Sequence, residues 1–168
     1  MLDPVDGDGV EERIRALGEP AGVVRMLDRH SRDCEAFARR LGVPLYDVPF
    51  DGVQGAPFEA VPVVRLPRWK EVALWFADER TLVCADVLTN AVGYKAASER
   101  IGVHPFLRLK PPGVLRDYDV RHLLLGHGEG LHGDDVPDAI DEALNHPWTR
   151  TPNLAVAQVR NVLGRVKP

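Results

Sequence analysis

The hydrophobic pattern near the N-terminus changes period twice, from strand-like to helix-like and back. Residues 21–27 (AGVVRML) form a short apolar run, which predicts a strand. Residues 33–41 follow with apolar side chains three to four positions apart, and Gly42 stands where a helix C-cap belongs. Residues 43–48 form a second apolar run. The order strand, helix, strand predicts a βαβ unit, preceded by a short helix over residues 11–17.

The middle of the chain has the pattern of antiparallel strands. Residues 61–66, 71–77 and 81–87 are apolar or alternating, and the polar residues 78–80 predict a tight turn between the last two. Residues 49–60 are rich in Gly and Pro, which predicts a loop. The pattern therefore favours a hairpin after the βαβ unit.

The C-terminal half alternates predicted helices with one strand. We expect a helix over residues 89–101 that ends at Gly102, a buried strand over 121–125 and a helix over 135–144. A last helix, residues 153–166, needs an apolar surface of this domain or of a partner chain. Together these elements predict an α/β fold with mixed sheets, formed by one domain over residues 1–168.

Composition restricts the class of protein. The chain has 168 residues and a net charge of −4, so no basic surface favours nucleic acid. No apolar run reaches the ~18 residues of a membrane span, and the acidic N-terminus lacks the pattern of a signal peptide. The two cysteines, Cys34 and Cys84, fit no disulfide framework. A reducing, cytoplasmic location is therefore expected.

The loop between the first predicted strand and helix gathers groups that can bind a metal. A carboxylate, an imidazole and a thiol are all zinc ligands. Arg32 would compete with a metal ion for the carboxylates, so the alternative is a loop of ion pairs in which Arg29 and Arg32 neutralise the two aspartates. A nucleophilic pair of Cys34 and His30 is a third interpretation. The polar groups of this loop are Asp28, His30, Arg32, Asp33 and Cys34.

Two further residues stand at predicted strand ends. Asp86 follows an apolar strand, where a carboxylate is expensive to bury unless it is paired or binds a metal; the alternative is a cap for the helix predicted after it. His127 lies between Gly126 and Gly128, which allow a sharp turn and a close approach of another group. The remaining histidines have no such context and are interpreted as ordinary surface or half-buried residues: His104, His122, His132 and His146.

Five segments in this order resemble the metallo-β-lactamase fold superfamily. MLDP resembles the family's early Asp-bearing turn, and VVRMLDRHSRD occupies the place of its His-x-His-x-Asp-His loop. LGVPLYDVP resembles the segment after that loop. EVALWFADERTLVCADVL resembles the hairpin leading to the metal-bridging aspartate, here Asp86. HLLLGHGEG resembles the last metal-binding histidine, here His127.

The resemblance implies a layered α/β/β/α fold without its N-terminal strands, and a hydrolase with a degenerate metal centre. The chain lacks the family's middle histidine, and its first motif fits in two registers, one offering Asp28, His30, Arg32 and Asp33 and the other shifted by one residue. Either one divalent metal ion, zinc first, is bound or none is. The implied ligands are His30, Asp33, Asp86 and His127, with Asp28 and Arg32 beside them and with Asp86 and Asp33 in catalytic roles.

The activity implied is metal-assisted hydrolysis of an ester, thioester or amide in a small molecule that the sequence does not identify. The alternative is a non-catalytic relative that acts as a binding domain or a dimeric scaffold. A homodimer is also expected because missing first strands would leave a sheet edge for another chain to cover. The C-terminal segment, residues 153–168, is a second candidate for packing on a partner.

Overall fold

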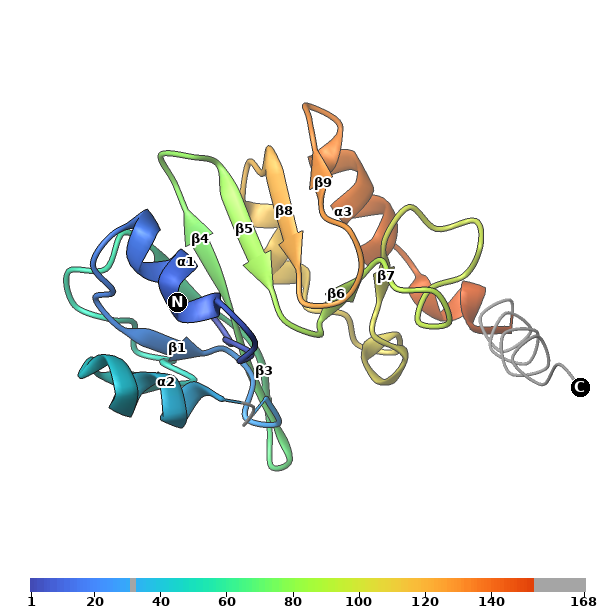
Figure 1. The fold of residues 1–168 in the computed structure, drawn as a ribbon. Coiled ribbons are helices and arrows are strands. Elements are labelled where there is room, and N and C mark those ends of the chain that lie inside the picture. The colour runs from blue at the N-terminus through green and yellow to red at the C-terminus, as the bar shows by residue number, and fades with distance from the viewer. Residues whose placement is uncertain (31–32, 153–168) are drawn as a thin grey trace, which may run out of the picture. The chain divides into compact units, whose positions relative to one another are not determined.

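A computed structural model describes residues 1–30 and 33–152 of the chain. The chain divides into two compact units, Met1–Val72 and Ala73–Pro168, and the boundary falls inside strand β4 (Trp69–Phe76) (Figure 1). Helices and both parallel and antiparallel strand pairs are present, so the predicted α/β class with mixed sheets is confirmed.

The first unit contains the predicted βαβ motif. Strands β1 (Val23–Arg25) and β2 (Leu45–Asp47) pair in parallel, with Val23 opposite Leu45, and helix α2 (Cys34–Leu41) connects them. Helix α2 ends at Gly42, whose positive φ of 68° allows its amide to reach back to the last turn. The prediction of this motif is confirmed. The elements are α1 (Val10–Leu17), β1 (Val23–Arg25), α2 (Cys34–Leu41), β2 (Leu45–Asp47), β3 (Glu59–Leu66) and the beginning of β4.

A small apolar core holds the first unit together. It forms where the apolar face of α2 packs on β1, and side chains from α1 and β2 close it. The spacing that predicted the helix thus also selects the face that is buried. The fully buried or nearly buried members are Val23, Cys34, Phe37 and Ala38.

The second unit is built on neighbouring strands in the order β4, β5, β8, β9 (Figure 1). Strand β5 (Thr81–Cys84) is antiparallel to β4 and parallel to β8 (His122–Leu125). Strand β9 (Leu131–His132) returns antiparallel to β8. The β4–β5 hairpin agrees with the prediction, and the parallel β5–β8 pair brings the carboxyl ends of two strands to one edge.

Shorter elements and one helix complete the described part of this unit. Helix α3 (Val136–Leu144) confirms the predicted helix over 135–144. It packs against the 3-10 turn η2 (Gly113–Asp117) and strand β7 (Gly102–Val103). Its apolar face is buried throughout. The other elements are β6 (Leu88–Thr89), β7 (Gly102–Val103) and the 3-10 turns η1 (Pro105–Leu107), η2 (Gly113–Asp117) and η3 (Pro147–Arg150).

The prediction of a helix over residues 89–101 is wrong. Strand β6 pairs with β7 instead, so Leu88 lies opposite Val103 and Thr89 opposite Gly102. Gly102 is therefore a strand residue and not a helix cap. The segment between them turns because the buried Glu99 carboxylate accepts a hydrogen bond from the backbone of Ala96. Tertiary contacts override the helical preference of the sequence here.

Strand β8 is less buried than its sequence predicts. The apolar run over 121–125 predicts a strand that is buried throughout, but in β8 only Leu123 is fully buried, and Leu124 is 41% exposed. The run therefore covers one face, as in a strand with a solvated side. The helix expected over residues 153–166 lies outside the described residues. None of the described helices has the length and hydrophobicity of a membrane span.

Candidate metal centre

Asp86 and His127 meet in the second unit. Their strands, β5 and β8, pair in parallel up to Cys84 and Leu125, and each of the two residues follows its strand by two positions. Because parallel strands present their carboxyl ends at one edge, the side chains converge. Asp86 Oδ1 lies 3.3 Å from His127 Nε2. The helix that Asp86 would cap in the alternative interpretation is absent, so the capping interpretation is wrong.

The glycines beside His127 are required by close backbone contacts. A Cβ atom on Gly126 would lie 2.6 Å from the carbonyl oxygen of Ala85, and one on Gly128 would lie 2.6 Å from the carbonyl carbon of Asn90. Gly128 also has a positive φ of 89°. Both positions exclude side chains. The loop 126–130 is therefore pressed against the segment that carries Asp86.

Hydrogen bonds fix the backbone of His127. Its carbonyl oxygen accepts a bond from the Asn90 amide at 3.0 Å and from Thr89 Oγ1 at 3.3 Å. The Asn90 side-chain amide donates to the carbonyl of Glu129 at 3.0 Å. The backbone that carries the imidazole is consequently held at His127 and at Glu129, which limits its freedom to move away from Asp86.

The two side chains differ in solvent access. The Asp86 side chain is 16% exposed, whereas that of His127 is 46% exposed. The Tyr94 ring lies nearly parallel to the imidazole, with 6.4 Å between ring centroids, and His104 lies 6.0 Å from Tyr94. A solute can therefore reach the imidazole, while the carboxylate behind it is largely covered.

A second carboxylate–imidazole pair lies in the first unit. Asp3 Oδ2 is 3.0 Å from His30 Nδ1, and Asp3 Oδ1 accepts a bond from the Met26 amide at 2.9 Å. Asp3 adopts a positive φ of 38°, which its short polar side chain tolerates. When Nδ1 carries the proton and donates to Asp3, Nε2 has the lone pair that a metal requires.

The other predicted residues of this loop have different surroundings. Asp33 precedes α2, and its carboxylate accepts a bond from the Asp6 amide at 2.8 Å. The Arg40 guanidinium, which donates to the Asp6 carboxylate, lowers the pKa of Asp6 below its usual value. Asp28 Oδ1 is buried and has no hydrogen-bond partner among the residues that the structure describes. Arg32 lies outside those residues.

The thiol of Cys34 has the surroundings of a core residue. The residue is completely buried, and its sulfur lies 3.8 Å from the backbone carbonyl oxygen of His30. A reactive thiol needs access to its substrate. The burial therefore argues against the interpretation of Cys34 as a nucleophile.

Sequence reasoning overlooked the buried carboxylate of Glu71. This residue of β4 is fully buried in the first unit, and its Oε2 accepts a bond from Trp69 Nε1 at 2.9 Å. The signal was available, since Glu71 occupies the same face of an alternating strand as Trp69. A charged residue on an inward face is as informative as one at a strand end, because both are costly to bury without a partner.

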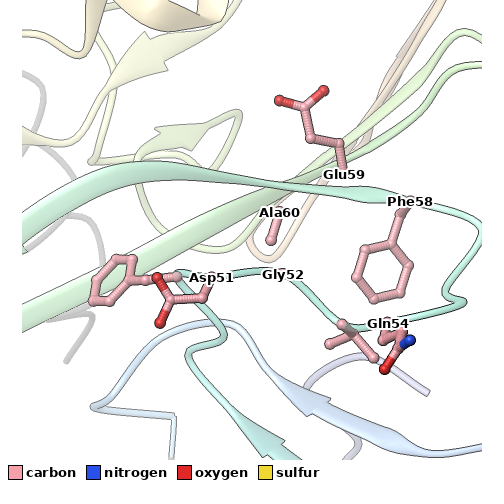
Figure 2. A pocket seen from close by; sticks show the side chains of 8 residues that line it. Asp51, Gly52, Gln54, Phe58, Glu59 and Ala60 are labelled. Atoms are coloured by element: carbon pink, nitrogen blue, oxygen red, sulfur yellow. The ribbon is translucent and has the colours of Figure 1, made fainter.

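The loop predicted over residues 49–60 surrounds a shallow hollow of about 430 Å³ in the first unit. Figure 2 shows the Phe58 ring and Gln54 on the loop side of β3, while the Glu59 carboxylate points to the opposite side. None of the predicted site residues lines this hollow. The lining residues are Phe50, Asp51, Gly52, Val53, Gln54, Phe58, Glu59 and Ala60.

The chemistry of the Asp86–His127 pair suits a metal ion. Two ligand atoms around a tetrahedral zinc ion with bonds of about 2.0–2.1 Å lie about 3.3–3.4 Å apart. The 3.3 Å between Asp86 Oδ1 and His127 Nε2 matches this separation. One carboxylate and one imidazole also form a common part of catalytic zinc sites.

No protein-family model and no curated protein sequence matches this chain.

Proposed function

We propose that this protein is a hydrolase similar to the metallo-β-lactamases, with a degenerate centre that uses at most one divalent metal ion. Zinc is the first choice because the pair combines a nitrogen and an oxygen ligand. The observation that carries the proposal is the convergence of Asp86 and His127 at the ends of two parallel strands. The substrate class is a small molecule with an ester, thioester or amide bond.

The residues have distinct roles in this proposal. Asp86 Oδ1 and His127 Nε2 are the ligands in the second unit, and the resemblance adds His30 and Asp33 of the first unit, which stay predictions. A bound ion would supply an activated water and polarise the carbonyl group of the substrate. In its alternative role, the Asp86 carboxylate would be the base that accepts the proton of that water, and not a ligand.

The family-level fold belongs to the same proposal. The βαβ motif followed by a mixed arrangement of strands supports an α/β/β/α architecture similar to that of the family. The buried cysteines Cys34 and Cys84 form no disulfide in the described residues, in keeping with the proposed reducing, cytoplasmic setting.

Metal binding tests the proposal. Protein purified without chelators is expected to contain close to one equivalent of zinc, iron or manganese by elemental analysis. His127→Ala and Asp86→Ala should each lower the zinc affinity by at least about 100-fold, since each removes a ligand atom from a small set. The affinity is measured by competition with a chelating dye.

The control for these variants is His146→Gln, which changes an exposed imidazole elsewhere in the second unit. It should leave the zinc affinity unchanged. His30→Ala and Asp33→Ala, measured in the same way, decide whether the first unit supplies ligands. The proposal is contradicted if the unsubstituted protein, freed of metal, has the same zinc affinity as the His127→Ala variant.

The second candidate function is a binding domain or dimeric scaffold without catalysis. The observation that favours it is a set of exposed apolar side chains in the second unit, among them Phe106 and Leu109, which are 79% and 88% exposed. Exposed apolar patches often mark protein contacts. Light scattering of the purified protein tests the homodimer: a mass near twice 18.6 kDa supports it.

A further inference from the structure

His122 and His132 form a contact, although the sequence analysis interpreted both as ordinary surface or half-buried residues. They are opposite each other in the register of β8 and β9, at the open end of the hairpin. Their Nδ1 atoms lie 3.0 Å apart, and their ring centroids 5.2 Å apart. The loop 126–130 closes the other end of this hairpin and carries His127.

Two imidazole nitrogens at this distance share either a proton or a metal ion. In the neutral pair, one Nδ1–H donates to the lone pair of the other. Imidazole is a preferred ligand of Zn²⁺, Ni²⁺ and Cu²⁺, and the second torsion angle of histidine is soft enough to turn both lone pairs toward one ion. The pair therefore has the donor set of a two-nitrogen chelate.

The spacing also indicates which ion fits. Nitrogens 3.0 Å apart, each bonded at about 2.05 Å, subtend about 95° at the metal. That angle belongs to square-planar or octahedral coordination, which Cu²⁺ and Ni²⁺ prefer. It is smaller than the angle of tetrahedral zinc. The neighbouring Arg121 is ion-paired with Asp134 at 3.3 Å, which reduces its repulsion of a cation.

We propose that His122 and His132 form a second metal site, independent of Asp86 and His127, which binds Cu²⁺ more tightly than Ni²⁺ and Ni²⁺ more tightly than Zn²⁺. Water occupies the remaining coordination positions, since the His132 side of the pair is exposed. This proposal does not depend on the hydrolase function proposed above.

Binding at this site would act on the loop that carries His127. Strand β9 is short, and its register with β8 consists of His122 opposite His132 and Leu123 opposite Leu131. An ion bridging the first of these pairs fastens the edge strand to its neighbour, and a ligand that binds only the folded state stabilises it. Slower hydrogen exchange is therefore expected in the loop 126–130 when the ion is bound.

The experiment uses the full chain with the Asp86→Asn and His127→Ala substitutions, which disable the other candidate centre. Cu²⁺ and Ni²⁺ are titrated by calorimetry in a buffer that does not chelate metals. His132→Gln or His122→Gln in this background should weaken Cu²⁺ binding at least tenfold, and the added His146→Gln substitution should not change it. Electron paramagnetic resonance of bound Cu²⁺ should report two imidazole nitrogens, and one in either variant.

Two results would overturn the proposal. One is an equal Cu²⁺ affinity in the Asp86→Asn, His127→Ala protein and in both glutamine variants made in that background. The other is a Cu²⁺ spectrum without coupling to imidazole nitrogen. Circular dichroism of the metal-free variants verifies that they are folded, and using both positions ensures that one informative variant remains.

Discussion

The Arg108→Met variant is expected to lose about 3–5 kcal/mol of the free energy of unfolding, because it removes the guanidinium paired with a buried carboxylate and leaves that carboxylate only the more distant Arg150, at 4.0 Å. Arg108 and Glu99 are 1% and 3% exposed. Their guanidinium and carboxylate groups form two parallel hydrogen bonds of 3.0 and 2.7 Å. The two side chains taken alone are each 1% exposed.

The pair also satisfies the backbone around it. Arg108 donates to the carbonyl oxygens of Val103 at 3.2 Å and Pro147 at 3.0 Å, and Glu99 accepts from the amide of Ala96 at 2.6 Å. Methionine is apolar and has no donors. The loss of the guanidinium therefore leaves several buried acceptors without this donor at once. A buried acceptor without a hydrogen-bond partner lowers the free energy of unfolding.

Urea denaturation monitored by circular dichroism measures the loss. Arg116→Met is the matched control, because its ion pair with Asp141 is exposed to solvent, and it should cost at most about 1 kcal/mol. The double variant Arg108→Met with Glu99→Leu should regain part of the loss, since no unpaired charge remains. If Arg108→Met and Arg116→Met lower the free energy of unfolding equally, the buried ion pair contributes no more to stability than the exposed one, and the prediction is wrong.

The same pair explains why sequence reasoning failed over residues 89–101. The segment has the length and composition of a helix. In the structure, however, the Glu99 carboxylate accepts a hydrogen bond from the Ala96 amide within a turn, and it pairs with Arg108, nine residues further along the chain. Local propensity contains no information about such a partner. Helix prediction is reliable only where the side chains do not supply a competing set of hydrogen bonds.

Other features of the fold and of the site could be predicted from the sequence, for a clear physical reason. The period of apolar residues in 21–48 specified both the βαβ motif and its buried face, because the two signals come from the same side chains. The glycines around His127 predicted close backbone contacts, and those contacts are present. The pairing of His122 with His132 was not readable, since it depends on the register that the loop 126–130 sets.

The second large effect is expected for Gly128→Ala, which should cost about 2–4 kcal/mol of the free energy of unfolding from backbone strain and overpacking. The added methyl group would lie 2.6 Å from the carbonyl carbon of Asn90 and 2.8 Å from the amide of Ala91, both of which are backbone atoms. The loop must then move away from Asn90. His127 moves with it, so zinc affinity should fall by about 10–100-fold, the range for lost support of a ligand.

Gly55→Ala is the matched control for this variant. Gly55 also has a positive φ, of 76°, but a Cβ atom added to it would meet no atom within 4 Å. The substitution should therefore cost only about 1 kcal/mol, from backbone strain alone, and leave zinc affinity unchanged. The difference between the two variants isolates the steric contact of the loop with Asn90. If both variants lose the same stability, the loop is not pressed against Asn90, and the arrangement that holds His127 beside Asp86 loses its physical basis.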